Sequence, residues 1–299
     1  MRRFLSIAKA TALEILSEPL SLLLLLAALV LSTVAPVLHY HQFGEASRMA
    51  RDAGFSALLT CGLLVAVFGT VKSFRREVES GTMQMALAHP VSRTGFLLAK
   101  AFGATLAYLV FAAIVAANAL TVVNGAEIGG RLAAARGDIP RIYGVSVALS
   151  MGTLLLPLIL GAALNRIARF RFVPTAFALA FVCAAIGVCP RFDLSLAARM
   201  LPVTVASILP VPLFIAAAAA FSVRFRANGV AAALTVLFAL TVPIVGNYHL
   251  PDALSRGGTL PWGYVGFAAL AMLPAVAAFL LLGSYLIGAR DADGANGNP

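Results

Sequence analysis

The sequence has few charged residues, and so it has few residues from which a soluble surface could be built. Only 11% of its 299 residues are charged and 61% are hydrophobic, and the mean hydropathy is +0.95. Soluble domains carry about 25% charged residues, so this composition excludes a soluble fold and indicates several membrane spans. The formal net charge is +10. Because the cations lie in short loops between apolar runs, we expect them to contact lipid head groups and not nucleic acid.

Two kinds of chemistry have no support in the sequence. The three cysteines, Cys61, Cys183 and Cys189, lie in or beside apolar runs without metal-ligand spacing. This favours buried thiols over a disulfide framework or a zinc site. There is also no G-x-x-x-x-G-K-[ST] phosphate loop and no soluble stretch long enough for an ATPase domain. We therefore predict no enzyme activity and no cofactor.

The apolar runs contain few polar residues. No Asp or Glu lies near the middle of a run, which disfavours ion-coupled transport, because such transporters keep an ionisable residue there. Asn118 and Ser150 do lie within runs, where a hydrogen bond between helices is favoured over contact with a substrate. One group resembles a metal or acid/base site: His39, His41, His249 and Asp252. Histidines at the membrane interface are the favoured interpretation, because the His-x-His spacing does not put both rings on one helical face.

Apolar runs of about 20 residues predict an all-α, polytopic membrane protein with six to eight transmembrane helices, eight being preferred. Four runs are long: Leu20–Leu38, Gly54–Val71, Gly95–Val123 and Tyr143–Leu164. Four later runs are shorter and richer in proline: Pro174–Cys189, Leu201–Val223, Gly229–Gly246 and Tyr264–Gly288. If the runs beside residues 191–200 are re-entrant, the count falls to six. We predict one transmembrane domain over residues 1–288 and a short disordered cytoplasmic tail over 289–299.

Residues 1–19 predict an amphipathic helix in the membrane interface. Six apolar residues share an arc of about 120° at helical spacing: Phe4, Leu5, Ala8, Ala12, Ile15 and Leu16. The alternative is a simple extension of the first span. With a cytoplasmic N-terminus and eight spans, the inner loops and ends carry 14 of the 22 Lys and Arg. By the positive-inside rule, both termini and the stretch from Lys72 to Lys100 are cytoplasmic.

The stretch from Lys72 to Lys100 has an ordered series of charge, turn and cap signals. Three cations follow the apolar run that ends near Val71, and two carboxylates, Glu77 and Glu79, come next and are expected to face water. The sequence Ser80-Gly81-Thr82 predicts a helix break, because glycine adopts a left-handed backbone readily. A short helix over residues 83–88 then precedes Pro90, and Ser92 is placed to cap the following apolar helix.

This order of residues resembles the loop between the second and third spans of type-2 ABC transporter permeases. The matching features are an acidic residue, Ser-Gly-Thr, an apolar helical turn, Pro90-Val91-Ser92-Arg93, and an apolar run that reaches a lysine. The amphipathic N-terminal helix and the sequence Pro261-Trp262-Gly263-Tyr264 at the start of the last span fit the same family. The family's loop usually ends in Leu-Gly-Lys, whereas this one ends in Leu98-Ala99-Lys100.

The resemblance implies the membrane-spanning subunit of an ATP-driven transporter, in the inner membrane of a bacterial cell and working as an exporter. Residues 72–94 would be the cytoplasmic coupling loop that docks on a separate ATPase subunit, and a second permease subunit, identical or paralogous, would pair with this one. The implied coupling residues are Arg76, Glu77, Glu79, Ser80, Gly81, Thr82, Met83, Pro90, Ser92 and Arg93. A nearly uncharged interior favours a lipid-like cargo over an ion.

Other interpretations stay open. The loop is alternatively an ordinary basic connector between two spans, and the chain is then an integral membrane assembly or anchoring factor without transport activity. A membrane-embedded enzyme that modifies lipids would need a cluster of polar residues in the spans, which the sequence does not show.

Overall fold

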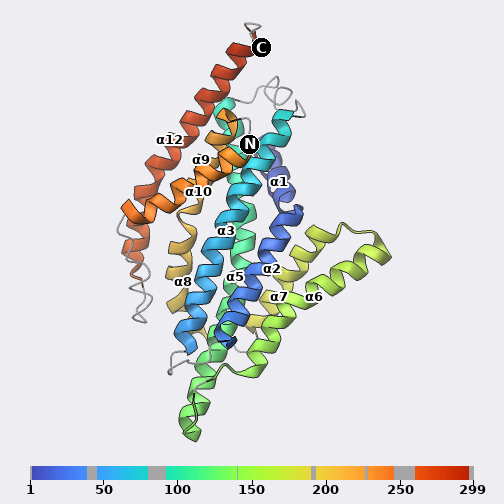
Figure 1. Cartoon of the computed structure of the whole chain (residues 1–299), viewed down its shortest axis with the longest axis vertical. Coiled ribbons are helices and arrows are strands. Elements are labelled where there is room, and N and C mark those ends of the chain that lie inside the picture. Colours follow the sequence, from blue (N-terminus) through green and yellow to red (C-terminus); the bar gives the residue numbers. More distant parts are fainter. Residues whose placement is uncertain are drawn as a thin grey trace.

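The structure is a computed structural model, and it describes residues 2–38, 46–79, 92–139, 141–189, 193–225, 228–245 and 260–295. Every regular element in these residues is an α-helix. The helices, shown in Figure 1, are α1 (Arg2–Leu16), α2 (Pro19–Leu38), α3 (Ala46–Glu79), α5 (Arg93–Arg136), α6 (Gly144–Ala168), α7 (Phe172–Val188), α8 (Leu194–Ile208), α9 (Val211–Arg224), α10 (Asn228–Val245) and α12 (Trp262–Ala295). The predicted fold class, an all-α polytopic membrane protein, is confirmed.

Within the described residues, six segments are long and apolar enough to cross a membrane. They are Pro19–Val37, Ala46–Glu77, Arg93–Arg136, Gly144–Ala168, Leu194–Arg224 and Trp262–Ala289. Two apolar helices, Phe172–Val188 and Gly229–Ala239, are shorter. The preferred count of eight spans is therefore not confirmed. α12 remains helical to Ala295, past Gly288, where the predicted tail begins.

The fifth of these segments begins earlier than hydropathy indicated, because Asp193 caps it. The Asp193 carboxylate accepts hydrogen bonds from the backbone amides of Ser195, at 2.9 Å, and Leu196, at 3.4 Å. Helix α8 starts at Leu194 and is followed, after a turn at Leu209–Pro210, by α9. Part of the polar stretch at residues 191–200 thus belongs to a membrane-length segment.

Helices α3 and α5 form the centre of the bundle, and α1, α2, α6, α7 and α9 all pack against α5. Two close approaches depend on glycine. A Cβ atom on Gly62 of α3 would lie 2.7 Å from the ring of Tyr108, and one on Gly103 of α5 would lie 2.4 Å from the carbonyl oxygen of Ala8 in α1. Small residues let membrane helices approach closely and gain packing contacts.

Residues Arg2–Leu16 form helix α1, but its buried face is rotated from the predicted apolar arc. Ala8, Thr11 and Ile15 are buried against the bundle, whereas the side chains of Leu5 and Leu13 are 54% and 51% exposed. The burial of Thr11 is possible because its hydroxyl donates a 3.0 Å hydrogen bond to the Ile7 carbonyl within the helix. The exposed leucines leave an apolar surface on the other side of α1.

A buried polar cluster joins three spans. The side-chain amide of Asn118 on α5 donates to Ser32 at 2.9 Å and to Thr33 at 3.1 Å on α2, and its carbonyl accepts from Ser150 on α6 at 2.8 Å. The hydrogen bonds between helices expected for Asn118 and Ser150 are confirmed. They satisfy polar groups that are costly to leave unpaired in an apolar environment.

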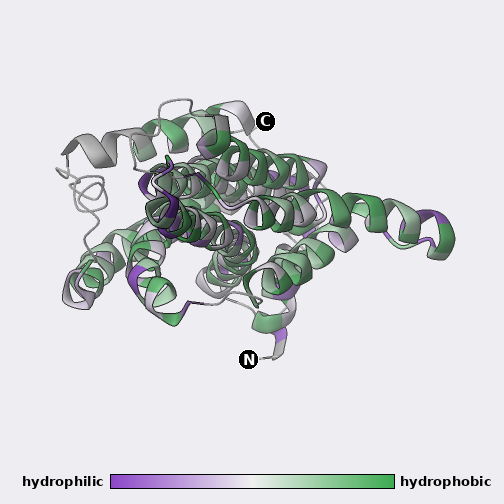
Figure 2. Ribbon diagram, turned by 90° about the horizontal axis from the view of Figure 1, so that it is seen from below, coloured by the Kyte–Doolittle hydropathy of each residue, from purple (hydrophilic) through white to green (hydrophobic). Residues whose placement is uncertain are grey.

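The outer helices leave much apolar surface uncovered. Helices α6 and α7 form a hairpin that extends away from one side of the bundle, and α12 lies along the other side of the bundle (Figures 1 and 2). α12 is held by aromatic contacts, with the Phe279 ring centroid 5.3 Å from Phe238 of α10 and 6.1 Å from Phe221 of α9. Many residues of these helices are hydrophobic (Figure 2), and their exposed large apolar side chains suit contact with lipid chains.

Candidate functional site

The candidate site lies where α3 ends and α5 begins, which we call the junction end of the bundle. The coupling segment expected from the sequence joins these two helices. Helix α3 continues as a helix to Glu79, so the first part of the predicted loop over residues 72–94 is helical. At the other side Ser92 caps α5, because its hydroxyl oxygen accepts a 3.1 Å hydrogen bond from the Gly95 amide, as the sequence predicted.

The centre of the junction end is a buried lysine. The Lys100 side chain is 0% exposed, and its ammonium group lies 3.0 Å from a Glu77 carboxylate oxygen. It also donates hydrogen bonds to the Ser73 carbonyl at 3.1 Å and the Ser73 hydroxyl at 2.9 Å. The ring centroid of Phe74 is 4.7 Å from the same nitrogen. A buried cation needs such partners, because its desolvation otherwise costs several kcal/mol. Lys100 therefore ties α5 to the last turns of α3.

The same end of α3 is tied to α1. The Ser73 hydroxyl, which accepts from Lys100, donates a 2.7 Å hydrogen bond to Glu14. Glu14 also lies 3.6 Å from Arg76, and Glu18 forms an ion pair with Lys72. A hydroxyl can donate and accept at once, so Ser73 connects the two sets of contacts. We call these seven residues the junction network: Glu14, Glu18, Lys72, Ser73, Arg76, Glu77 and Lys100.

The structure describes four side chains of the predicted coupling residues. Arg76 pairs with Glu14, Glu77 pairs with Lys100, Ser92 caps α5, and Arg93 is the first residue of α5. The backbone of Glu79 ends α3, but its side chain lies outside the described part. The short helix predicted over residues 83–88 lies outside the described residues. So do the remaining predicted coupling residues: Ser80, Gly81, Thr82, Met83 and Pro90.

One expectation about these residues is wrong. Glu77 was expected to face water, yet its side chain is only 28% exposed and points toward Lys100. The reason is that α3 continues beyond the apolar run, so Glu77 lies four residues after Ser73, on the face that packs against α5. Lys100 itself was missed as a structural residue. The signal was a lysine inside an otherwise apolar helix, which requires a nearby counter-ion.

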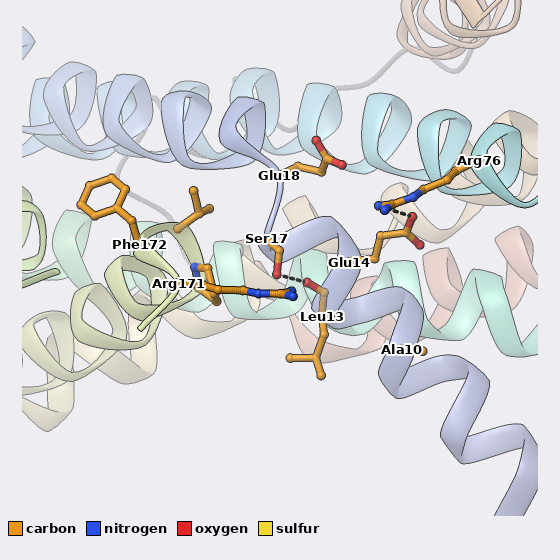
Figure 3. A pocket seen from close by; sticks show the side chains of 10 residues that line it. Ala10, Leu13, Glu14, Ser17, Glu18, Arg76, Arg171 and Phe172 are labelled. Carbon is orange, nitrogen blue, oxygen red and sulfur yellow. Dashed lines mark hydrogen bonds and ion pairs between the residues drawn. The ribbon is translucent and has the colours of Figure 1, made fainter. Parts of the chain in front are cut away.

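A groove opens beside the junction network (Figure 3). Its volume is about 690 Å³, and it lies between the end of α1, the end of α3 and the start of α7. Its lining residues are Ala10, Leu13, Glu14, Ser17, Glu18, Arg76, Arg171, Phe172, Val173 and Pro174. Volumes of about 300–1,000 Å³ are typical of ligand sites.

The described part of the chain holds no group of three or more His, Cys, Asp or Glu residues that could bind a metal ion. The four residues that resembled a metal or acid/base site, His39, His41, His249 and Asp252, lie outside the described residues. The junction network contains charges and hydroxyls but no arrangement of nucleophile and base. It is suited to holding helices together rather than to a reaction.

No curated protein matches this chain. The protein-family model described as "ABC-2 family transporter protein" matches residues 12–257, which is 246 of the 299 residues. The match begins within α1 and includes the whole junction network. It confirms the resemblance to type-2 ABC transporter permeases, which are the membrane-spanning component of such transporters and not the ATPase. The chain therefore belongs to the ABC-2 family of transporter proteins, as a membrane-spanning component.

Proposed function

We propose that this chain is the permease subunit of an ATP-driven exporter and that a separate ATPase subunit drives it through the segment between α3 and α5. The observation that carries the proposal is the junction network, because it connects both ends of that segment to the bundle. The family supports the same conclusion, and the sequence contains no phosphate loop of its own.

The junction network gives a mechanical route from the segment to the spans. Glu77 and Lys100 fix the end of α3 to the first turns of α5, and Ser73 with Glu14 adds α1. A push on residues 80–91 would therefore move α1, α3 and α5 together, as one body. Closure of an ATPase dimer would supply that push and shift the bundle between inward-open and outward-open states.

The assembly follows from the same proposal. Two permease subunits, identical or paralogous, pair around a central path, and two ATPase subunits dock on the cytoplasmic side. The excess of Lys and Arg at the junction end supports a cytoplasmic placement of this end and of both termini, in a bacterial inner membrane. In Figure 1 the start of α1 and the end of α12 lie toward that end of the bundle. The apolar interior favours a lipid-like cargo.

The proposal is tested with two variants in the coupling segment. Gly81→Pro fixes the backbone at a negative φ, and Glu79→Arg reverses a charge expected to face the ATPase. Both variants should reach the membrane at near-normal levels but lose transport and the stimulation of ATP hydrolysis, and Glu79→Arg should also weaken co-purification of the ATPase.

The matched control is Asp138→Arg, which reverses an exposed acid just beyond the far end of α5. It should leave transport and subunit association unchanged. Normal transport by both segment variants would make the loop a simple connector and would refute coupling through this segment. ATP hydrolysis by the highly purified single chain would also refute the proposal.

A further inference from the structure

The groove of Figure 3 lies where three apolar helices meet polar surroundings. Glu18 directly precedes the span that starts at Pro19, Arg171 directly precedes the apolar helix α7, and Arg76 belongs to the last turns of α3. The polar ends of apolar helices lie at the depth of lipid head groups. The groove is therefore placed to receive a head group from the surrounding bilayer.

The charges that line the groove are balanced, but not all are paired. Its lining holds two carboxylates and two guanidinium groups. Glu14 accepts a hydrogen bond from Ser73 and forms an ion pair with Arg76. Glu18 pairs through one carboxylate oxygen with Lys72. The Arg171 side chain has no ion pair or hydrogen bond within the part of the chain that the structure describes. In Figure 3 it extends toward the end of α1, beside Ser17.

Apolar residues complete the other side of the groove. Leu13 is 51% exposed there, and Phe172, Val173 and Pro174 line the wall from α7. The groove thus offers the guanidinium group of Arg171, the carboxylate of Glu18, which pairs through one oxygen only, and an apolar wall. These three features match a molecule that carries a phosphate, an ammonium group and hydrocarbon chains. We infer that the groove binds the head group of a zwitterionic aminophospholipid of the phosphatidylethanolamine class, with its phosphate on Arg171 and its ammonium group on Glu18.

The charge balance separates this lipid from the alternatives. An anionic lipid without an amine would place its phosphate on Arg171 but would leave Glu18 without a new partner, and it would add negative charge beside two carboxylates. A choline head group has the phosphate but lacks N–H donors, so it cannot donate a hydrogen bond to Glu18. The lipid bridges the turn between α1 and α2 and the start of α7, and its binding does not depend on transport or on the ATPase.

The test uses the full-length chain, purified in a mild detergent and titrated with three lipids of equal chain length in native mass spectrometry. We expect phosphatidylethanolamine to bind more tightly than phosphatidylcholine or phosphatidylglycerol. Arg171→Gln should weaken its binding about tenfold, which is the effect of losing one charge-assisted hydrogen bond. The matched control is Arg166→Gln, which removes an exposed arginine of the same hairpin from outside the groove.

Four outcomes would overturn the inference. The first is equal binding of phosphatidylglycerol and phosphatidylethanolamine, which would show nonspecific attraction to a basic surface. The second is an equal loss in Arg171→Gln and Arg166→Gln. The third is that the groove binds no lipid in the free chain and is covered only when the ATPase binds. That result would make the groove part of a protein interface. The fourth is an unchanged preference for phosphatidylethanolamine over phosphatidylcholine in Glu18→Gln, which removes the charge of the side chain but keeps its shape and should therefore abolish that preference.

Discussion

Removing the charge of Glu77 should destabilise the protein strongly, although the residue lies near the end of a helix. Glu77→Gln keeps the size of the side chain but leaves the ammonium group of Lys100, 0% exposed, without its ion-pair partner. Breaking a buried pair from one side typically costs about 3–5 kcal/mol. We expect about 3 kcal/mol, the lower end, because Lys100 keeps two hydrogen bonds to Ser73 and the ring of Phe74.

The reverse change should cost less. Lys100→Met removes the buried cation and leaves a carboxylate that is 28% exposed and can reach water. The double variant Glu77→Gln/Lys100→Met should be within about 1 kcal/mol of the wild type, because an apolar side chain often replaces a buried ion pair at little cost. A double-mutant cycle over these three variants then measures the coupling directly.

The assay is unfolding of the purified chain by titration with a denaturing detergent, followed by helical circular dichroism. The matched control is Arg131→Gln near the far end of α5, where the guanidinium group lies 3.8 Å from Glu127 and 72% of the arginine side chain is exposed. Exposed helical pairs contribute about 0.3–0.5 kcal/mol, so this control should be nearly neutral. If Glu77→Gln is as stable as Arg131→Gln, Lys100 is not held by its counter-ion and the junction network has no structural role.

Three further outcomes are expected. Asn118→Ala should cost about 1–2 kcal/mol in the same assay, since it removes three hydrogen bonds between spans, whereas Ser207→Ala, which loses only a bond within its own helix, should cost less. Gly103→Ala should destabilise the packing of α1 because its Cβ would meet the Ala8 carbonyl at 2.4 Å, and Gly152→Ala, with its nearest contact at 3.7 Å, should not. In a cysteine-free background of intact cells, an impermeant thiol reagent should label Arg136→Cys but not Arg166→Cys; the opposite result would invert the proposed orientation.

The long apolar helices could be predicted because hydropathy and cap residues agree there. The start of α5 is an example, since Ser92 precedes the apolar run and caps the helix. The end of α5 could not be read in the same way. Hydropathy ends near Val123, but the helix continues to Arg136 and stops at Gly137, whose φ of 74° is left-handed. A polar stretch rich in alanine remains a good helix former, so loss of hydropathy does not mark the end of a helix.

The candidate site was predicted in sequence position but not in geometry. The cap at Ser92 and the placement of Arg76 beside the coupling segment follow from local signals. The inward turn of Glu77 depends on how far α3 continues and on which face meets α5, and neither is local. No local signal in the sequence marks Glu14 or Glu18 as contacts, yet they bind the end of α3. Such contacts between helices have no pattern within either helix alone.

The pairing of Lys100 has a consequence for biosynthesis. A lysine inside an apolar segment opposes membrane insertion, by about 2.5–3.5 kcal/mol at the centre of a helix and by less near its end. Glu77 is only 23 residues earlier in the chain, so it has already been synthesised when α5 begins to leave the ribosome. The two charges can therefore neutralise each other while α3 and α5 enter the bilayer as a hairpin, before the later helices have entered it.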